Sequence, residues 1–345
     1  MKMRCHESPK TLIIGSTGFI GKFITDACLA AGHTTFLLLR PGSHKHAVIK
    51  ALQDKGAVVI HGTITEQELM EKLLKEHQIE FVISAVGGDR IMDQLVLVKA
   101  IKAVGHVKRF LPSEFGHDID RAEPVEPGLT FYKAKREVRR LVEESGIPFS
   151  YICCNSIAAW PYHDNTHPAD VLPPTDHFII YGDGSVPAYF VAGTDIGKFT
   201  EMALADHRTL NKTVHFQPPT NLVNINQMAC LWEDKVGRKL PRVTMTEEDL
   251  LSAAKDGPFP ESVVASLTHD IFINGCQINY LLDKEKDVEI CSLYPEVAFK
   301  TLDSCFDDFL MKMVENEEKA SSSQSENGII SGVVSSNHEA LVIAA

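Results

Sequence analysis

The sequence predicts an α/β fold built on a doubly wound parallel sheet, and three observations support this prediction. A short apolar run, residues 11–14, ends in glycines that are spaced three apart. Short apolar segments then alternate with amphipathic ones over about the first 150 residues. Hydrophobic residues make up 44% of the 345, enough for a sizeable core. Strands that alternate with helices pair in parallel and bury both faces of their sheet, so a Rossmann-type architecture is expected.

Each strand of the first half is expected to precede a helix. The predicted strands are residues 11–14, 34–39, 57–60, 81–85 and 109–111. The first predicted helix ends near residue 31, and the next three cover residues 50–55, 66–77 and 93–104. Gly32 and Gly56 mark two of the helix ends, since glycine favours the left-handed conformation found there. A longer helix begins at Gly128 and ends at Gly146 and Pro148, and a strand over 149–152 follows.

The chain is expected to divide into three parts. Residues 9–155 form the dinucleotide-binding domain, and residues 156–312 form a smaller, mainly substrate-binding α/β lobe. Four prolines between residues 161 and 174 suggest a loop-rich lid. Residues 313–345 are Ser-rich and lack periodicity, which predicts a flexible tail.

The loop after the first strand indicates a dinucleotide site. Glycines in such a loop allow a tight turn and a close approach of the backbone to a pyrophosphate. The helix that follows offers unpaired N–H groups and a favourable dipole to the phosphates. A plain structural turn is the alternative. The expected cofactor contacts in this loop are Gly15, Ser16, Thr17, Gly18, Phe19, Ile20 and Gly21.

The end of the second strand predicts which dinucleotide binds. An acidic residue there would bind the ribose hydroxyl of NAD, whereas an arginine accommodates the 2′-phosphate of NADP. Arg40 stands at this position and Lys45 lies nearby, so NADPH is expected; an ordinary exposed loop pair is the alternative. The fourth strand ends at the same sheet edge, so Ser84, Ala85 and Val86 are expected to approach the cofactor.

The helix that begins at Gly128 carries the candidate catalytic residues. Tyr132 and Lys135 lie three apart on one face, whereas short-chain dehydrogenases space their Tyr/Lys pair as YxxxK. The displaced tyrosine makes Lys135 the better candidate, because burial favours the uncharged amine and an amine can act as a base. A solvated lysine is the alternative. His117 follows the fifth strand, near the expected cofactor edge, and imidazole suits proton transfer. The chain has fifteen histidines, so the pattern alone favours an ordinary structural histidine.

Three further motifs, together with the glycine loop, resemble a known family. The motifs are Arg109-Phe110-Leu111-Pro112, Ile152-Cys153-Cys154-Asn155 and Thr268-His269-Asp270. From about residue 9 to 312, the chain resembles the plant NADPH-dependent reductases of phenylpropanoid metabolism, which include isoflavone, pinoresinol-lariciresinol and phenylcoumaran benzylic ether reductases. The resemblance places Lys135 on the catalytic lysine and gives His117 a substrate-side role.

The resemblance implies an NADPH-dependent enzyme that reduces a flavan-3,4-diol at C4 to a flavan-3-ol through a quinone methide. Isoflavone or benzylic ether reduction, or a non-catalytic NADP-sensing role, are the alternatives. Cys154 and Asn155 are also expected at the cofactor, and Ser156 and Ile157 join His117 and Tyr132 at the substrate. Cys153 and Cys154 are expected to pack beneath the pocket rather than react, and His269 is expected to be structural.

Composition excludes several other classes of function. The net charge of −12 argues against a nucleic-acid partner, which would require a basic face. Eight cysteines without a CxxC pair predict free thiols in a reducing compartment, and a cytoplasmic location is expected. No apolar run reaches the roughly 18 residues of a membrane span. Neither a metal nor an obligate protein partner is expected.

Overall fold

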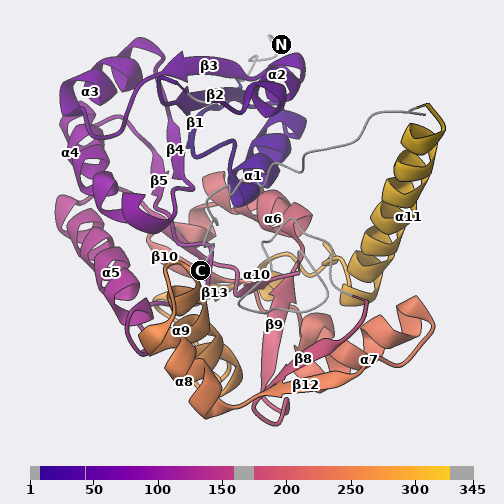
Figure 1. Ribbon diagram of the computed structural model, residues 1–345. Helices are drawn as coiled ribbons and strands as arrows, with labels where there is room; N and C mark the ends of the chain where they lie inside the picture. The colour runs from indigo at the N-terminus through magenta and orange to yellow at the C-terminus, as the bar shows by residue number, and fades with distance from the viewer. Residues whose placement is uncertain (1–7, 43, 159–174, 327–345) are drawn as a thin grey trace.

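The computed structural model describes residues 8–42, 44–158 and 175–326. Five parallel strands form its first sheet, in the order β3-β2-β1-β4-β5 (Figure 1). Their bounds are β1 Lys10–Ile14, β2 Thr34–Leu39, β3 Val58–His61, β4 Phe81–Ser84 and β5 Arg109–Leu111. Because β1 lies at the centre, with β2 on one side and β4 on the other, the chain reverses its direction of winding there. The predicted doubly wound α/β fold is confirmed.

The sheet continues beyond β5 through segments that are distant in sequence. A parallel bridge between Phe110 and Phe149 joins β5 to the start of β6 (Ser150–Cys153). Strand β6 pairs in parallel with β10 (Lys212–His215), which pairs in parallel with β13 (Asp287–Glu289). The chain therefore returns to this sheet twice after residue 155, and the division predicted at that residue is not a simple cut along the sequence.

Helices cover both faces of the sheet because successive strand residues point to opposite faces and both sets are apolar. Ile13 and Ile83 pack with α1 and α6, whereas Leu12 and Val82 pack with α3, α4 and α5. Helices α1 and α6 approach closely, since a Cβ at Gly197 would lie 2.2 Å from the Phe23 carbonyl oxygen. The helix bounds are α1 Phe19–Ala30, α2 His46–Asp54, α3 Gln67–Glu76, α4 Gln94–Val104, α5 Gly128–Ser145, α6 Gly193–Ala205 and α10 Ile290–Leu293.

A second core fills the smaller lobe, which lies below the sheet in Figure 1. Trp232, Phe190, Phe272 and Phe306 are among its largest fully buried side chains. Two small sheets line it, in the orders β11-β9-β7 and β12-β8. Its strands are β7 Ser156–Ile157, β8 Phe178–Tyr181, β9 Pro187–Val191, β11 Leu222–Asn224 and β12 Arg242–Met245. Its helices are α7 Ile225–Val236, α8 Glu247–Asp256, α9 Glu261–Phe272 and α11 Leu302–Glu326.

Helix α11 extends past the point where the sequence predicts a tail. It continues to Glu326, so residues 313–326 are helical and only 327–345 lie outside the described residues. Residues 161–174, which hold the predicted Pro-rich lid, also lie outside them. Among the helices that the structure describes, none has the length and apolar character needed to cross a bilayer.

Candidate active site

The glycine loop sits at the carboxyl edge of the sheet, between β1 and β4. Gly15 adopts a positive φ of 79°, and a Cβ there would lie 2.4 Å from the Ala85 carbonyl oxygen. Gly21 packs under the turn, where a Cβ would lie 2.1 Å from the Gly15 carbonyl oxygen. The Ala85 amide donates to the Ile14 carbonyl at 2.8 Å, which holds the two strand ends together. Any larger residue at positions 15 and 21 would force the loop apart.

Several polar groups around this loop have no hydrogen-bond partner among the described residues. Gly18 caps α1 without a side-chain hydrogen bond, so the first helical N–H groups remain available to an anion. The hydroxyl groups of Ser16 and Ser84 are buried, and neither forms a hydrogen bond with a described residue. Buried hydroxyl groups are normally satisfied, so both are suited to a bound ligand. Thr17, Phe19 and Val86 are half-buried at the same edge, and Ile20 is buried against the core.

Arg40 and Lys45 are exposed beside the glycine loop. Arg40 directly follows β2, and Lys45 precedes α2. Neither side chain forms an ion pair with a residue that the structure describes. Two exposed cations at the end of the second strand fit a 2′-phosphate, and together with the glycine loop they fit NADPH.

Lys135, Tyr132 and His117 come together beneath this edge. All three side chains are buried, two on α5 and His117 on the loop that follows β5. The Lys135 Nζ donates to the Glu114 carbonyl at 2.9 Å, and burial lowers the pKa of this amine. The Tyr132 hydroxyl and His117 Nε2 form a hydrogen bond. The solvated alternative for Lys135 is wrong, because the apolar stripe of α5 draws its neighbours into the core.

Burial also sets the protonation states of the two partners. It lowers the pKa of His117 to about 3, with the nearby Lys135 charge acting in the same direction and Asp118 opposing it. Burial raises the pKa of the Tyr132 hydroxyl well above its usual range. At neutral pH, His117 is therefore an uncharged imidazole and Tyr132 an uncharged phenol. An uncharged imidazole is a poor proton donor, so the surroundings of His117 favour its substrate-side role.

The segment after β6 contributes four further predicted residues. Cys154 is buried in the core beneath the cofactor edge. Asn155 has a positive φ of 60°; its Nδ2 donates to the Phe216 carbonyl at 2.8 Å, while its buried Oδ1 has no partner among the described residues. Ser156 accepts a hydrogen bond from Gln277 at 2.8 Å, and Ile157 is half-buried in β7. This segment thus leads from the sheet edge into the smaller lobe.

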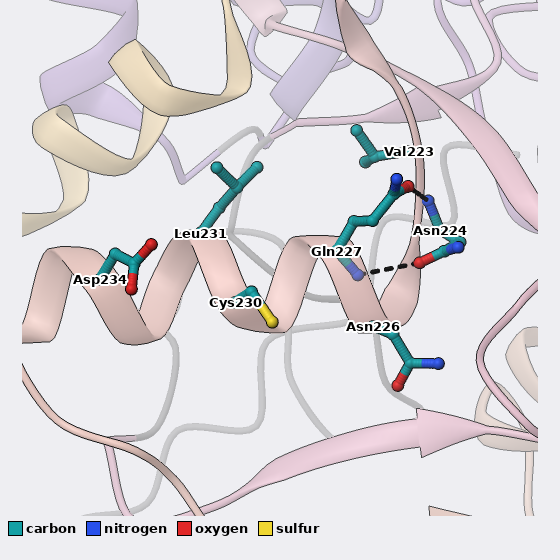
Figure 2. A pocket seen from close by; sticks show the side chains of 7 residues that line it. All are labelled: Val223, Asn224, Asn226, Gln227, Cys230, Leu231 and Asp234. Atoms are coloured by element: carbon teal, nitrogen blue, oxygen red, sulfur yellow. Dashed lines mark hydrogen bonds between the residues drawn. The ribbon is translucent and has the colours of Figure 1, made fainter.

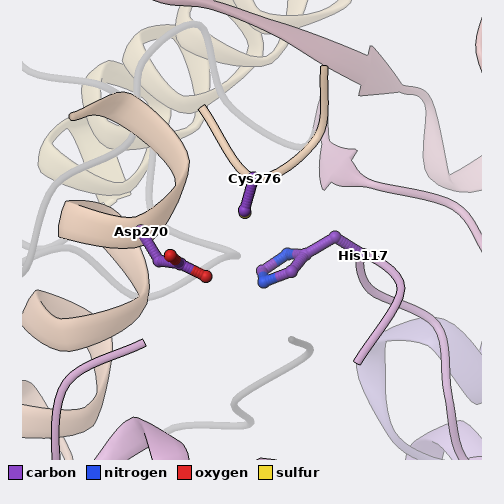
Figure 3. Close-up of side chains that lie close together, drawn as sticks. All are labelled: His117, Asp270 and Cys276. Carbon is purple, nitrogen blue, oxygen red and sulfur yellow. The ribbon is translucent and has the colours of Figure 1, made fainter. Parts of the chain in front are cut away.

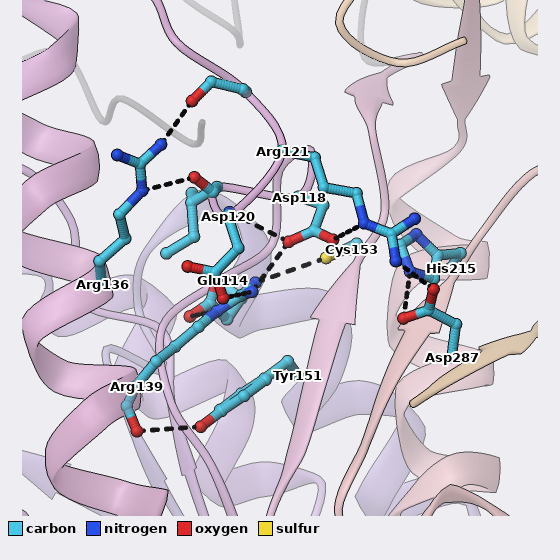
Figure 4. A network of polar contacts seen from close by, with 12 residues as sticks. Glu114, Asp118, Asp120, Arg121, Arg136, Arg139, Tyr151, Cys153, His215 and Asp287 are labelled. Atoms are coloured by element: carbon cyan, nitrogen blue, oxygen red, sulfur yellow. Dashed lines mark hydrogen bonds and ion pairs between the residues drawn. The ribbon is translucent and has the colours of Figure 1, made fainter. Parts of the chain in front are cut away.

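A buried ion network supports the loop that carries His117, and sequence reasoning does not find it (Figure 4). Arg139 on α5 contacts Glu114 through two hydrogen bonds, at 3.0 and 2.9 Å, and Asp118 at 2.8 Å. Arg121 extends the network from Asp118 to Asp287 on β13. Because Glu114 also supplies the carbonyl that holds Lys135, the network fixes the position of the candidate base. Its only sequence signal is the helical spacing of Arg139 one turn beyond Lys135.

A second missed group faces His117 from the smaller lobe. Figure 3 shows the side chains of His117, Asp270 and Cys276 pointing toward one another. Their donor atoms all lie within 4.8 Å of one another, and all three residues are buried. Asp270 belongs to the third sequence motif, and its neighbour His269 contacts Glu247 at 3.0 Å, in keeping with a structural role. The expected absence of a metal stays a prediction.

A separate pocket lies along α7, in the smaller lobe (Figure 2). Two of the polar residues that line it, Asn224 and Gln227, form hydrogen bonds with each other at the start of α7. The Gln227 backbone N–H donates to Asn224 Oδ1 at 2.8 Å, and Gln227 Oε1 accepts from the Asn224 backbone N–H at 2.9 Å. These two bonds form a capping box, so the polar groups here serve helix α7.

The fold and this site define a class of protein, and comparisons with known proteins agree. The model of the NmrA-like family matches residues 7–306, and the chain belongs to this family. A leucoanthocyanidin reductase of Desmodium uncinatum is 60% identical over 304 residues, which are 87% of this chain and 80% of that protein. A phenylcoumaran benzylic ether reductase of Betula pendula is 38% identical, covering 88% of this chain and 99% of that protein.

Solved structures give the same result. The binary complex of leucoanthocyanidin reductase with NADPH from Vitis vinifera is 60% identical, with a TM-score of 0.84 over 88% of this chain and 99% of that one. An isoflavone reductase structure is 36% identical, with a TM-score of 0.80 over 88% of this chain and 100% of that one. The predicted resemblance to the plant reductases is confirmed.

Proposed function

We propose that this chain is an NADPH-dependent reductase of flavonoid biosynthesis that converts a flavan-3,4-diol such as leucocyanidin into a flavan-3-ol such as catechin. The observation that carries the proposal is the buried Lys135 amine beside Tyr132 and His117, at the edge where the glycine loop lies. The 60% identity to a protein named leucoanthocyanidin reductase supports this substrate class over those of relatives near 38% identity. The same identity favours an enzyme over a non-catalytic NADP sensor.

The residues around the glycine loop fit NADPH. The helix end at Gly18 and the unpartnered hydroxyl groups of Ser16 and Ser84 would hold the pyrophosphate and ribose. Arg40 and Lys45 would hold the 2′-phosphate. When bound, NADPH supplies a hydride to an electrophilic carbon of the substrate.

The chemistry of the substrate explains why an amine is required. Hydroxide is a poor leaving group, so direct displacement at C4 is slow. Removal of a proton from a phenol ortho or para to that carbon pushes electrons into the ring and expels the C4 hydroxyl as the quinone methide forms. Lys135 would take this proton, because burial lowers the pKa of its amine and the Glu114 carbonyl fixes its position.

His117 and Tyr132 are placed to bind and orient the substrate. Their mutual hydrogen bond fixes the two rings, whose centroids lie 5.2 Å apart. Uncharged His117 can exchange hydrogen bonds with a substrate hydroxyl without carrying a charge into the core. Ser156 and Ile157 lie on the lobe side of the same segment and would contact the rest of the flavan.

Steady-state kinetics with three substrate classes test the proposal. NADPH consumption is measured with a flavan-3,4-diol, an isoflavone and a phenylcoumaran, and the products are identified by chromatography. The diol should have the highest kcat/KM, and its A-ring methylated derivative should be inert because it has no phenolic proton on the ring that is conjugated to C4. Preferred turnover of an isoflavone or phenylcoumaran would assign the chain to that activity instead, and normal reduction of the methylated diol would exclude the quinone-methide route.

We also propose a cytoplasmic location. Within the described residues, seven cysteines are free thiols, five of them buried. Free thiols in that number suit a reducing compartment. A fluorescent fusion expressed in plant cells tests this, and accumulation in the secretory pathway would contradict it. The proposed partner is the small-molecule diol alone, with no nucleic acid or obligate protein partner.

A further inference from the structure

Asp270 is a buried carboxyl group without a full set of partners. It lies on α9, is 2% exposed, and belongs to the Thr268-His269-Asp270 motif, to which the proposed function gives no role. Its Oδ1 accepts a hydrogen bond from Asn274 at 3.2 Å. Its Oδ2 has no nitrogen or oxygen partner among the described residues, although the Cys276 thiol lies beside it. A buried carboxyl oxygen in this position is normally satisfied, so a ligand is expected to reach it.

Asp270 and His117 lie close enough for one oxygen atom to contact both. Their donor atoms lie within 4.8 Å of each other, and no direct hydrogen bond joins them among the described residues. One oxygen placed about 2.8 Å from each atom, with an angle near tetrahedral, spans roughly 4.6 Å. The gap between the carboxyl group and the imidazole therefore suits a hydroxyl group or a water molecule held by both.

We propose that Asp270 is the general acid of the reaction, a catalytic residue that protonates the C4 hydroxyl as it leaves, while His117 orients that hydroxyl. This inference rests on the proposed reduction of a flavan-3,4-diol. It assigns the two protons to different elements: Lys135 on α5 removes the phenolic proton, and Asp270 on α9 delivers one to the departing oxygen. The active site is then completed only when the smaller lobe packs against the sheet edge.

The surroundings of each group support this division. Burial lowers the pKa of His117 to about 3, so its imidazole is uncharged and a poor proton donor. Burial raises the pKa of Asp270, which favours the neutral acid that can donate a proton. The groups that face the pair from all neighbouring elements are Tyr132, Lys135, Asp118, Glu123, His269, Asn274 and Cys276.

The atoms and electrons of the proposed step balance. The phenolic proton moves to Lys135, the C4–O bond breaks with its electron pair on oxygen, and the Asp270 proton joins that oxygen to release water. Hydride addition at C4 restores the aromatic ring, and Lys135 returns its proton to the phenolate. Asp270 regains a proton from solvent. The net change consumes one NADPH and one proton, and it yields the flavan-3-ol, NADP⁺ and water.

The test compares leaving groups in wild type and Asp270→Asn. With the natural C4 hydroxyl, we expect kcat to fall roughly 10²- to 10⁴-fold, the usual contribution of a general acid. With a 4-nitrophenyl ether at C4, which leaves without a proton, the variant should approach the wild-type rate. Asp234→Asn, which removes an exposed carboxyl group on α7, is the matched control and should leave both rates unchanged. NADPH affinity, measured by fluorescence, should be the same in all three proteins.

Infrared difference spectroscopy gives a readout that does not depend on turnover. Wild type minus Asp270→Asn should show the carbonyl band of a protonated carboxyl group at neutral pH. Equal loss of rate with both leaving groups, or the absence of that band, would overturn the assignment of Asp270. If wild type itself does not reduce the diol, the proposed function fails, whereas wild-type activity with an unimpaired Asp270→Asn variant rejects only this inference.

Discussion

Replacing Arg139 with methionine should destabilise the protein more than any surface substitution on the same helix. Arg139, Glu114 and Asp118 are 1%, 2% and 3% exposed, so their charges are almost completely removed from water. Methionine keeps much of the volume but leaves Glu114 without its cation and Asp118 with Arg121 alone. Removal of one partner from a buried ion pair typically costs about 3–5 kcal/mol. Since domains are stable by only about 5–15 kcal/mol, the folded state would lose a large part of its margin.

Urea titration followed by circular dichroism measures this cost. The dependence of the unfolding free energy on urea concentration should not change. The urea concentration at the unfolding midpoint should fall by an amount that corresponds to about 3–5 kcal/mol of unfolding free energy. Arg140→Met is the matched control: Arg140 is about half exposed and pairs with Asp120 and Glu143 at the surface, so a change of about 0.2–1 kcal/mol is expected. Adding Glu114→Gln to Arg139→Met should recover part of the loss. Equal midpoints for the Arg139 and Arg140 variants would refute the reasoning.

Three further predictions concern cofactor binding and catalysis. Arg40→Ala should weaken NADPH binding at least tenfold while leaving NADH affinity unchanged, because a charge-assisted contact is worth about 1.5–3 kcal/mol. A fluorescence titration measures both affinities, and equal affinity of wild type for the two cofactors would contradict this prediction. Gly21→Ala should abolish NADPH binding measured by calorimetry, because the added Cβ would lie 2.1 Å from the Gly15 carbonyl oxygen. Retained binding would show that the loop can move to accommodate the methyl group. The unprotonated Lys135 amine is the active form and burial lowers its pKa, so kcat should rise with pH and reach a plateau. Lys135→Met should lower kcat roughly 10²- to 10⁴-fold and should lose that rise. An unchanged pH profile in this variant would exclude Lys135 as the base.

Local signals in the sequence explain the parts of the fold that could be predicted. Short apolar runs separated by helix stops correspond to β1, β2 and β4, and the glycine spacing marks the turn between β1 and α1. Helix starts are less exact, since α2 begins at His46 rather than Lys50. The helical stripe of α5 carries Lys135 into the core, which composition alone does not reveal, because Lys133 and Arg140 on the same helix are exposed.

Contacts between distant segments explain what the sequence could not predict. Strands β10 and β13 join the sheet more than 50 residues after β6, and nothing in their short, largely polar sequences specifies that pairing. Asp270 reaches His117 only because α9 packs against α5, across about 150 residues of chain. The Arg139 network likewise depends on a loop and a helix that meet in three dimensions. Candidate site residues within one local motif could be proposed from the sequence pattern, whereas their partners on other elements required the structure.

The most direct test of the central claim follows a labelled hydride from NADPH to the product. Wild type and Lys135→Met are incubated with a flavan-3,4-diol and NADPH that carries deuterium at the reactive nicotinamide position, and the product is examined by NMR. Wild type should give a flavan-3-ol with one deuterium at C4, and Lys135→Met should give almost none in the same time. Deuterium at another carbon, or undiminished labelling by the Lys135 variant, would contradict reduction at C4 with Lys135 as the base.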